Sequence, residues 1–135
     1  MVRAADGSLA SPMVTADADG RPFVWVPNGV GNDTTGSGAG RVSFTFFAAS
    51  ATTVTFGFEV IAPTGNDDSF FIQVDGGSPG LWHTPRSTTW TWRTYGTSFN
   101  VAAGAHTLNV IQREDGTKLA SVRIESGDAI FQKGT

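Results

Sequence analysis

The chain contains no cysteine among its 135 residues. Disulfide bonds, thiolate nucleophiles and cysteine-ligated zinc are therefore excluded. Only 16% of the residues are charged, against about 25% in an average domain. The formal net charge is −3 and basic residues form no cluster. A sequence with these properties is not expected to bind nucleic acid or an anionic membrane.

Long apolar runs are absent as well. No run approaches the roughly 18 residues that a membrane span needs, and the N-terminus lacks the charged and apolar segments that mark a signal peptide. The length fits one domain over residues 1–135. We expect this domain to be a monomer and to belong, outside the cell, to a larger secreted protein.

Helical periodicity is missing, whereas alternation of apolar and polar residues recurs along the chain. The clearest case is the segment 53–60, where Val54, Phe56, Phe58 and Val60 alternate with polar or small residues. Strands are predicted at 22–26, 41–47, 53–60, 70–74, 90–101 (as one bent strand or two), 106–112, 119–125 and 129–132. Seventeen glycines, together with prolines between the segments, favour an all-β fold. We predict an antiparallel β-sandwich of the jelly-roll type.

Antiparallel order also predicts which loops lie together, because each strand reverses the direction of the chain. If Leu81 and Trp82 form a short strand and 90–101 is one strand, loops 27–40, 62–68, 83–89 and 113–118 share one end. We call it the loop end. The loops at the opposite end, 48–52, 75–80 and 102–105, have the composition of plain turns.

Carboxylates, amides, basic groups and indoles gather in the loops of the loop end. Binding residues on loops held by a rigid scaffold are a common arrangement. The candidate ligand-binding residues are Trp25, Asn66, Asp67, Asp68, Trp82, His83, Arg86, Trp90, Arg113, Asp115 and Lys118. The residue types suit a sugar, whose apolar faces stack on aromatic rings and whose hydroxyls bond planar polar groups.

Four tryptophans are enough for such stacking, but β-sandwiches also bury tryptophan. We expect Trp92 to pack inside and Trp82 to lie at a loop. Trp90 shares a strand face with Trp92, since residues two apart point the same way. Trp90 and Trp25 fit either the core or the rim of the sandwich.

Other interpretations of the polar loops are open. The run Asn66–Asp68 could bind calcium through its oxygens, but a turn that caps its own backbone, or a hydrogen-bonding site for sugar, is favoured. Arg113 and Glu114 could form a surface pair of little energetic value. Asp115 with the following glycine is a common hairpin turn.

Signals of catalysis are weak. The sequence contains none of the common hydrolase, metalloprotease or phosphate-loop motifs. His106 alternates in register with Leu108 and is expected to be a structural strand residue. Asp67 or Asp68 with Glu114 could imitate a glycosidase carboxylate pair, but nothing else in the sequence supports this, so we expect no enzyme activity.

Five stretches together resemble a known family. They are Phe23-Val-Trp-Val-Pro-Asn-Gly29, Ala62-Pro-Thr-Gly-Asn-Asp-Asp-Ser-Phe-Phe71, Trp82-His-Thr-Pro-Arg-Ser-Thr-Thr-Trp-Thr-Trp92, Ala103-Gly-Ala-His-Thr-Leu108 and Arg113-Glu-Asp-Gly-Thr-Lys-Leu119. In combination they are similar to the galactose-binding-like β-sandwich modules near carbohydrate-binding module families 6 and 35. The resemblance covers nearly the whole chain.

This resemblance implies a jelly roll that binds glycans without catalysis, in a cleft among loops, as an appendage of a secreted polysaccharide-degrading enzyme. Trp82 or Trp90 would stack on the sugar. Lys118 occupies a position where asparagine is often found, which could favour an acidic or sulfated glycan.

The resemblance also makes a prediction about metal. Related modules carry Glu-Ala-Glu near the start and Leu-Asp near the last strand, and these acids hold a structural calcium ion. Here the matching segments are Arg3-Ala4-Ala5 and Leu119-Ala120. We therefore predict that the structural calcium site is lost and that no cofactor is required, although calcium could still bind at the loop end.

The leading hypothesis is a non-catalytic carbohydrate-binding module that binds a polysaccharide or oligosaccharide and targets an attached catalytic domain. The alternative is a structural or adhesive β-sandwich of a secreted protein with no sugar site. Burial of all four tryptophans would favour the alternative.

Overall fold

The computed structural model describes residues 1–18 and 20–132. Its strands are β1 (Val2–Arg3), β2 (Ser8–Ala10), β3 (Val14–Ala18), β4 (Arg21–Trp25), β5 (Arg41–Ala48), β6 (Thr52–Ala62), β7 (Ser69–Val74), β8 (Gly80–His83), β9 (Ser87–Val101), β10 (Gly104–Gln112), β11 (Lys118–Ser126) and β12 (Ala129–Phe131). A single 3₁₀ turn, η1 (Ala4–Asp6), is the helical element in this part of the chain. Among the residues described, no helix has the length and apolar character of a membrane span.

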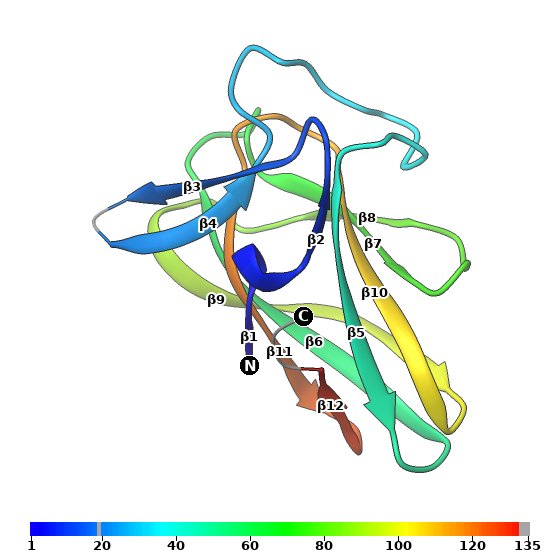
Figure 1. The fold of residues 1–135 in the computed structure, drawn as a ribbon. Coiled ribbons are helices and arrows are strands. Elements are labelled where there is room, and N and C mark those ends of the chain that lie inside the picture. Colours follow the sequence, from blue (N-terminus) through cyan, green and yellow to red (C-terminus); the bar gives the residue numbers. More distant parts are fainter. Residues whose placement is uncertain (19, 133–135) are drawn as a thin grey trace.

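The strands form two antiparallel sheets that face each other (Figure 1). Sheet A has the order β3-β4-β11-β6-β9, with β1 also paired to β11. Sheet B has the order β12-β5-β10-β7-β8, with β2 also paired to β5. The predicted all-β antiparallel sandwich is confirmed.

The core lies between the sheets and is built by the alternating residues. From sheet A, Phe56 and Phe58 on β6 are fully buried, and from sheet B Phe46 and Leu108 meet them. The rings of Phe46 and Phe56 pack edge to face with centroids 5.5 Å apart. Burial of such side chains supplies the main driving force for folding.

The strands predicted from alternation are all present, with bounds shifted by a few residues. The segment 90–101 is part of one long strand, β9, and Leu81 and Trp82 do form a short strand, β8. Strands β1, β2 and β3 were not predicted. The first two have only two and three residues, and β3 is exposed or half-buried along its whole length, so no apolar alternation marks it.

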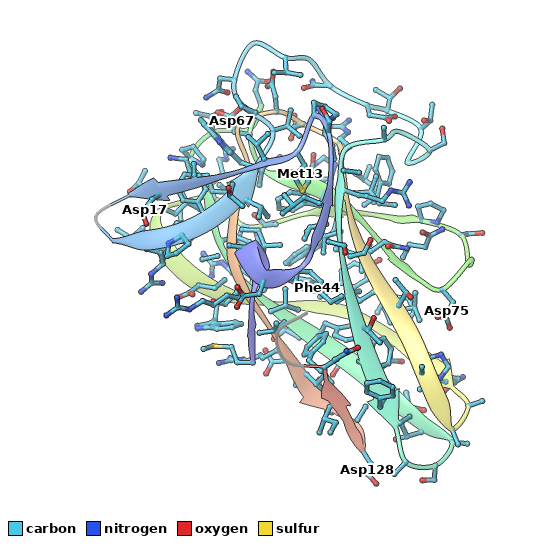
Figure 2. All side chains as sticks on the ribbon, viewed as in Figure 1. Met13, Asp17, Phe44, Asp67, Asp75 and Asp128 are labelled. Atoms are coloured by element: carbon cyan, nitrogen blue, oxygen red, sulfur yellow. The ribbon has the colours of Figure 1, made fainter. Side chains whose placement is uncertain are left out.

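The predicted loop end is confirmed by backbone hydrogen bonds between its loops. The amide of Asp33 donates to the carbonyl of Arg113 (2.8 Å), that of Glu114 to the carbonyl of Ser69 (3.4 Å), and that of Thr84 to the carbonyl of Asp68 (2.7 Å). Figure 2 shows Asp67 at this end of the sandwich and Asp128 at the opposite end.

Candidate functional site

A buried polar cluster lies at the loop end where β7 and β8 meet the loop after β10. Glu114 does pair with Arg113, but it is only 6% exposed, so the pair does not lie at the surface. The carboxylate of Glu114 accepts hydrogen bonds from the Ser69 hydroxyl (2.7 Å) and the Asp68 amide (3.2 Å), and Arg113 lies 3.3 Å away. The imidazole of His83 lies 3.4 Å from Asp68.

The pKa values of the two carboxyl groups of this cluster, Asp68 and Glu114, are shifted in opposite directions. Burial, with a contribution from Glu114, raises the pKa of Asp68. Burial also acts on Glu114, but hydrogen bonds from Ser69 and Asp68 outweigh it and lower the pKa of that group. Ligand atoms of Asp68, His83 and Glu114 lie within 4.8 Å of one another, close enough for a metal ion. Glu114 also contacts Ser69 and Arg113, whereas Asp68 and His83 contact each other at 3.4 Å.

The remaining acids of the loop end have structural partners. Asp115 accepts hydrogen bonds from the amides of Gly29 (3.0 Å) and Gly31 (2.9 Å) and so fixes the loop after β4. Asp67 accepts a hydrogen bond from the Thr64 hydroxyl (3.2 Å). Since Asp67 and Asp68 face different partners, the run 66–68 does not converge on one point. Asn66 and Arg86 are exposed.

The structure reverses the expected places of two tryptophans. Trp82 does not lie at a loop: it belongs to β8, is half-buried and packs on Phe58 and Tyr95 with centroids 5.1 and 5.5 Å away. Trp92 does not pack inside. It lies opposite Glu59 on the outer face of sheet A, and the guanidinium of Arg123 stacks 4.1 Å from its ring.

Trp25 and Trp90 lie on the same outer face, around the buried ring of Phe23. Its centroid is 5.8 Å from that of Trp25 and 5.7 Å from that of Trp90. The ammonium of Lys118 lies 5.3 Å from the rings of both Phe23 and Trp25. We call Phe23, Trp25, Trp90 and Lys118 the aromatic cluster. Three of the residues predicted for the site are thus brought together, on the sheet face beside the loop end rather than in the loops.

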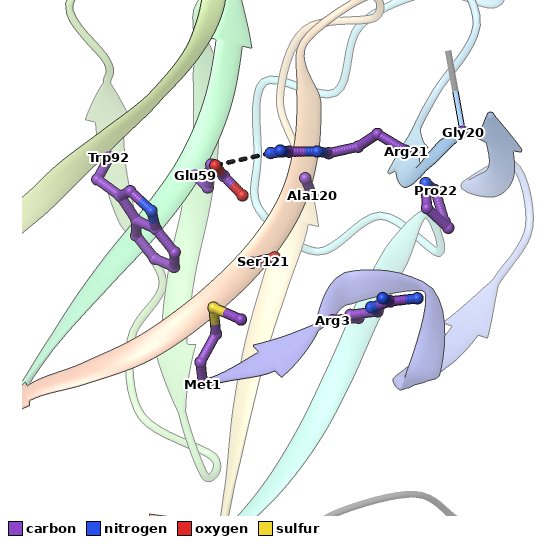
Figure 3. Close-up of a pocket in the computed structure, with 9 residues that line it drawn as sticks. All are labelled: Met1, Arg3, Gly20, Arg21, Pro22, Glu59, Trp92, Ala120 and Ser121. Carbon is purple, nitrogen blue, oxygen red and sulfur yellow. Dashed lines mark hydrogen bonds and ion pairs between the residues drawn. The ribbon is translucent and has the colours of Figure 1, made fainter. Parts of the chain in front are cut away.

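A groove of about 280 Å³ opens on this outer face next to the aromatic cluster (Figure 3). Its lining is formed by Met1, Arg3, Gly20, Arg21, Pro22, Glu59, Trp92, Ala120 and Ser121. Arg3, Ser121, Glu59 and Trp92 are register partners across β1, β11, β6 and β9, so they form one row across four strands.

The floor of the groove is a β-bulge. The register between β11 and β6 shifts between Leu119 and Ser121, which leaves Ala120 without a partner on β6. Leu119 and Val122 both point into the core, and the two small residues between them line the groove. The guanidinium of Arg21 crosses β11 at this point and pairs with Glu59 at 2.7 Å. The spacing of three between Leu119 and Val122 was the signal for the bulge.

The residues at the predicted lost calcium site lie in this groove. Arg3 is the register partner of Ser121, next to Ala120. A guanidinium stands where the resemblance implied a carboxylate, and the nearby Glu59 is engaged by Arg21. A calcium ion prefers several hard, anionic oxygens, so the residues present do not fit a structural calcium ion.

No protein-family model matches the sequence, and no curated protein matches it either. Solved structures do match. A family 35 carbohydrate-binding module from Clostridium thermocellum superposes with a TM-score of 0.68 at 16% identity, over 90% of this chain and 93% of that one. A family 35 module from an environmental isolate has a TM-score of 0.62 at 16% identity, over 100% and 92%.

The same fold occurs inside enzymes. A ruminal GH26 endo-β-1,4-mannanase matches with a TM-score of 0.63 at 18% identity, over 93% of this chain but only 25% of that one. The chain therefore spans nearly all of the family 35 modules and about a quarter of the mannanase. The chain has the galactose-binding-like β-sandwich fold of the carbohydrate-binding modules.

Proposed function

We propose that the chain is a non-catalytic carbohydrate-binding module that holds a polysaccharide on the outer face of sheet A. In the parent protein it would bring an attached secreted, extracellular glycan-degrading enzyme to its substrate. The likeness of fold to family 35 modules supports the class. The aromatic cluster carries the proposal, because Trp25 and Trp90 lie half-buried on an outer face where packing of the core does not require them.

The chemistry of the aromatic cluster suits a pyranose ring. Trp25 and Trp90 offer apolar surfaces, and the buried ring of Phe23 holds both indoles in place. Lys118 adds a charged donor for a ring hydroxyl beside these surfaces. The exposed side chains Asn66 and Arg86 at the loop end would contact a longer chain as it leaves the face.

Affinity electrophoresis against a panel of soluble polysaccharides tests this proposal. The panel holds β-glucans, xylans, mannans, pectins, agarose, carrageenan and alginate, each with calcium and with a chelator. Retardation by at least one polymer is expected. If no polymer retards the folded protein, the proposal fails and the structural or adhesive sandwich becomes the better interpretation.

Substitution then tests the place of binding. Trp90→Ala should weaken binding between about twofold and thirtyfold, since stacking on an aromatic ring contributes about 0.5–2 kcal/mol. The matched control is Phe47→Ala, which removes a 40% exposed aromatic ring from sheet B. Equal affinities of the two variants for the retarding polymer would exclude the aromatic cluster as the binding surface.

A further inference from the structure

Three side chains that can bind a metal ion meet where sheet B reaches the loop end. They are Asp68, which directly precedes β7, His83, which is the last residue of β8, and Glu114, which lies in the loop after β10. One ligand atom of each lies within 4.8 Å of those of the other two. Two carboxylates and an imidazole form a donor set that suits zinc, which proteins bind through histidine nitrogen and carboxylate oxygen.

Backbone pairing fixes the positions of these three residues. Strands β10, β7 and β8 are neighbours in sheet B, and Ser69 is the register partner of His83. The amide of Glu114 donates to the carbonyl of Ser69 (3.4 Å). The amide of Thr84 donates to the carbonyl of Asp68 (2.7 Å). The three ligands are therefore held by adjacent strand ends, so little conformational freedom is lost when an ion binds.

The spacing of His83 and Asp68 is that of two ligands of one ion. Nδ1 of His83 lies 3.4 Å from Oδ1 of Asp68, beyond the range of about 2.7–3.2 Å for most N–H···O hydrogen bonds. Two ligands of a tetrahedral zinc ion, each about 2.1 Å from the metal, lie about 3.4 Å apart. The other histidine provides the contrast, because Nδ1 of His106 lies 2.7 Å from Asp75, at the distance of a direct hydrogen bond.

Glu114 is oriented by its own partners. Its Oε1 accepts hydrogen bonds from the Ser69 hydroxyl (2.7 Å) and the Asp68 amide (3.2 Å), and its Oε2 lies 3.3 Å from the Arg113 guanidinium. Carboxylates that bind metals are commonly held by such hydrogen bonds. The two carboxylates outweigh the charge of Arg113, so the cluster attracts a cation. The His83 side chain is 56% exposed and leaves the cluster open to solvent.

We propose that Asp68, His83 and Glu114 bind a zinc ion at the loop end, with water at the fourth tetrahedral position. Calcium does not suit this site, because it prefers about six to eight oxygen ligands and the imidazole offers nitrogen. The ion would join β7, β8 and the loop after β10, and would stabilise the folded chain by binding to it. The inference is independent of carbohydrate binding, so either proposal can fail while the other stands.

Isothermal titration of the untagged full chain with Zn²⁺ tests the proposal. A single zinc ion should bind per chain, and the melting temperature should rise with zinc concentration because the ion binds the folded state. An excess of Ca²⁺ should not displace the ion, since the donor set includes nitrogen. If the folded chain binds no zinc, or if Ca²⁺ displaces it, the proposal is wrong.

Matched variants locate the ion. His83→Gln and Asp68→Asn should each weaken zinc binding at least about a hundredfold, because loss of a group that merely orients a ligand already costs about 10–100-fold. Asp67→Asn removes the same charge from the adjacent residue, which bonds to Thr64, and should leave the zinc affinity unchanged. His106→Gln is the control for loss of a histidine. Equal effects of Asp67→Asn and Asp68→Asn, or of His106→Gln and His83→Gln, would overturn the site.

Discussion

Trp82 and Trp92 have exchanged the roles that their sequence contexts indicated. Trp82 has turn residues nearby, yet β8 directs it onto Phe58 and Tyr95. Trp92 lies within a strand, between Thr91 and Arg93, yet it faces outward, opposite Glu59. A neighbouring turn therefore says little about which side of a strand is buried.

Replacement of Trp82 should cost stability rather than binding. We expect Trp82→Ala to lower the free energy of unfolding by about 3 kcal/mol, because it opens a cavity beside two core rings. Urea denaturation measures this, with Phe47→Ala as the control for loss of an exposed ring. A loss no greater than that of the control would contradict the assignment of Trp82 to the core.

Alternation predicted that Trp90 and Trp92 share a face, and this is confirmed, since both lie on the outer face of sheet A with Arg21 and Arg123 on their rings. It could not say which face. Strand β9 is at the edge of sheet A, where residues of both faces are half-buried, so hydrophobicity does not separate inside from outside. The register of pairing with β6 decides which residues of β9 face outward, and the sequence pattern does not reveal this register.

At the scale of elements, the end of β10 opposite the loop end is fixed to the β7–β8 turn by a histidine. As expected, His106 is a structural strand residue. One ring nitrogen lies 2.7 Å from Asp75 and the other 2.7 Å from the carbonyl of Ala102. The bond to Ala102 and the bond to Asp75 raise the pKa of His106. Burial acts against Asp75, but bonds from Thr107 and His106 outweigh it and lower the pKa of Asp75.

These shifts predict a pH range of greatest stability. The stabilisation from His106 is fully present below its ordinary pKa of 6.5 and is lost as pH rises through the raised value. That from Asp75 is present above its ordinary pKa of 3.8 and is lost as pH falls through the lowered value. The pair should therefore contribute most between pH 3.8 and 6.5.

Thermal unfolding across this range checks the prediction. In His106→Gln the decline in melting temperature above pH 6.5 should become shallower than in the parent chain. The control is His83→Gln, whose side chain is 56% exposed and bonds only weakly to Asp68. A decline unaltered by His106→Gln would contradict this role.

For the whole molecule, the alternating direction of successive strands predicted that the four loops lie at one end. This prediction depended on a short strand at Leu81 and Trp82. The assumption holds because β8 exists. Strand direction alone does not predict that many polar residues at that end form hydrogen bonds with one another. Glu114 accepts hydrogen bonds from Ser69 and Asp68, and Asp115 accepts them from amides of the loop after β4. Partner choice among polar groups depends on distances that a linear pattern does not contain.

We also propose that calcium does not hold this fold together. The melting temperature should be the same in calcium and in chelator, because Arg3 and Ala120 offer no carboxylate. Differential scanning calorimetry measures this directly. A higher melting temperature in calcium that persists in Asp68→Asn would contradict the prediction, whereas one that disappears in that variant would assign the ion to the loop cluster.

The bulge at Ala120 allows the binding face and the interior to change independently. Leu119 and Val122 keep their places in the core on either side of it, so the extra residue is accommodated on the outer side of the sheet, where Ala120 and Ser121 are 1% and 7% exposed. The depth of the groove then depends on two adjacent codons, 120 and 121. A substitution at either position would reshape the floor of the groove, while the hydrophobic packing of Leu119 and Val122 stays as it is.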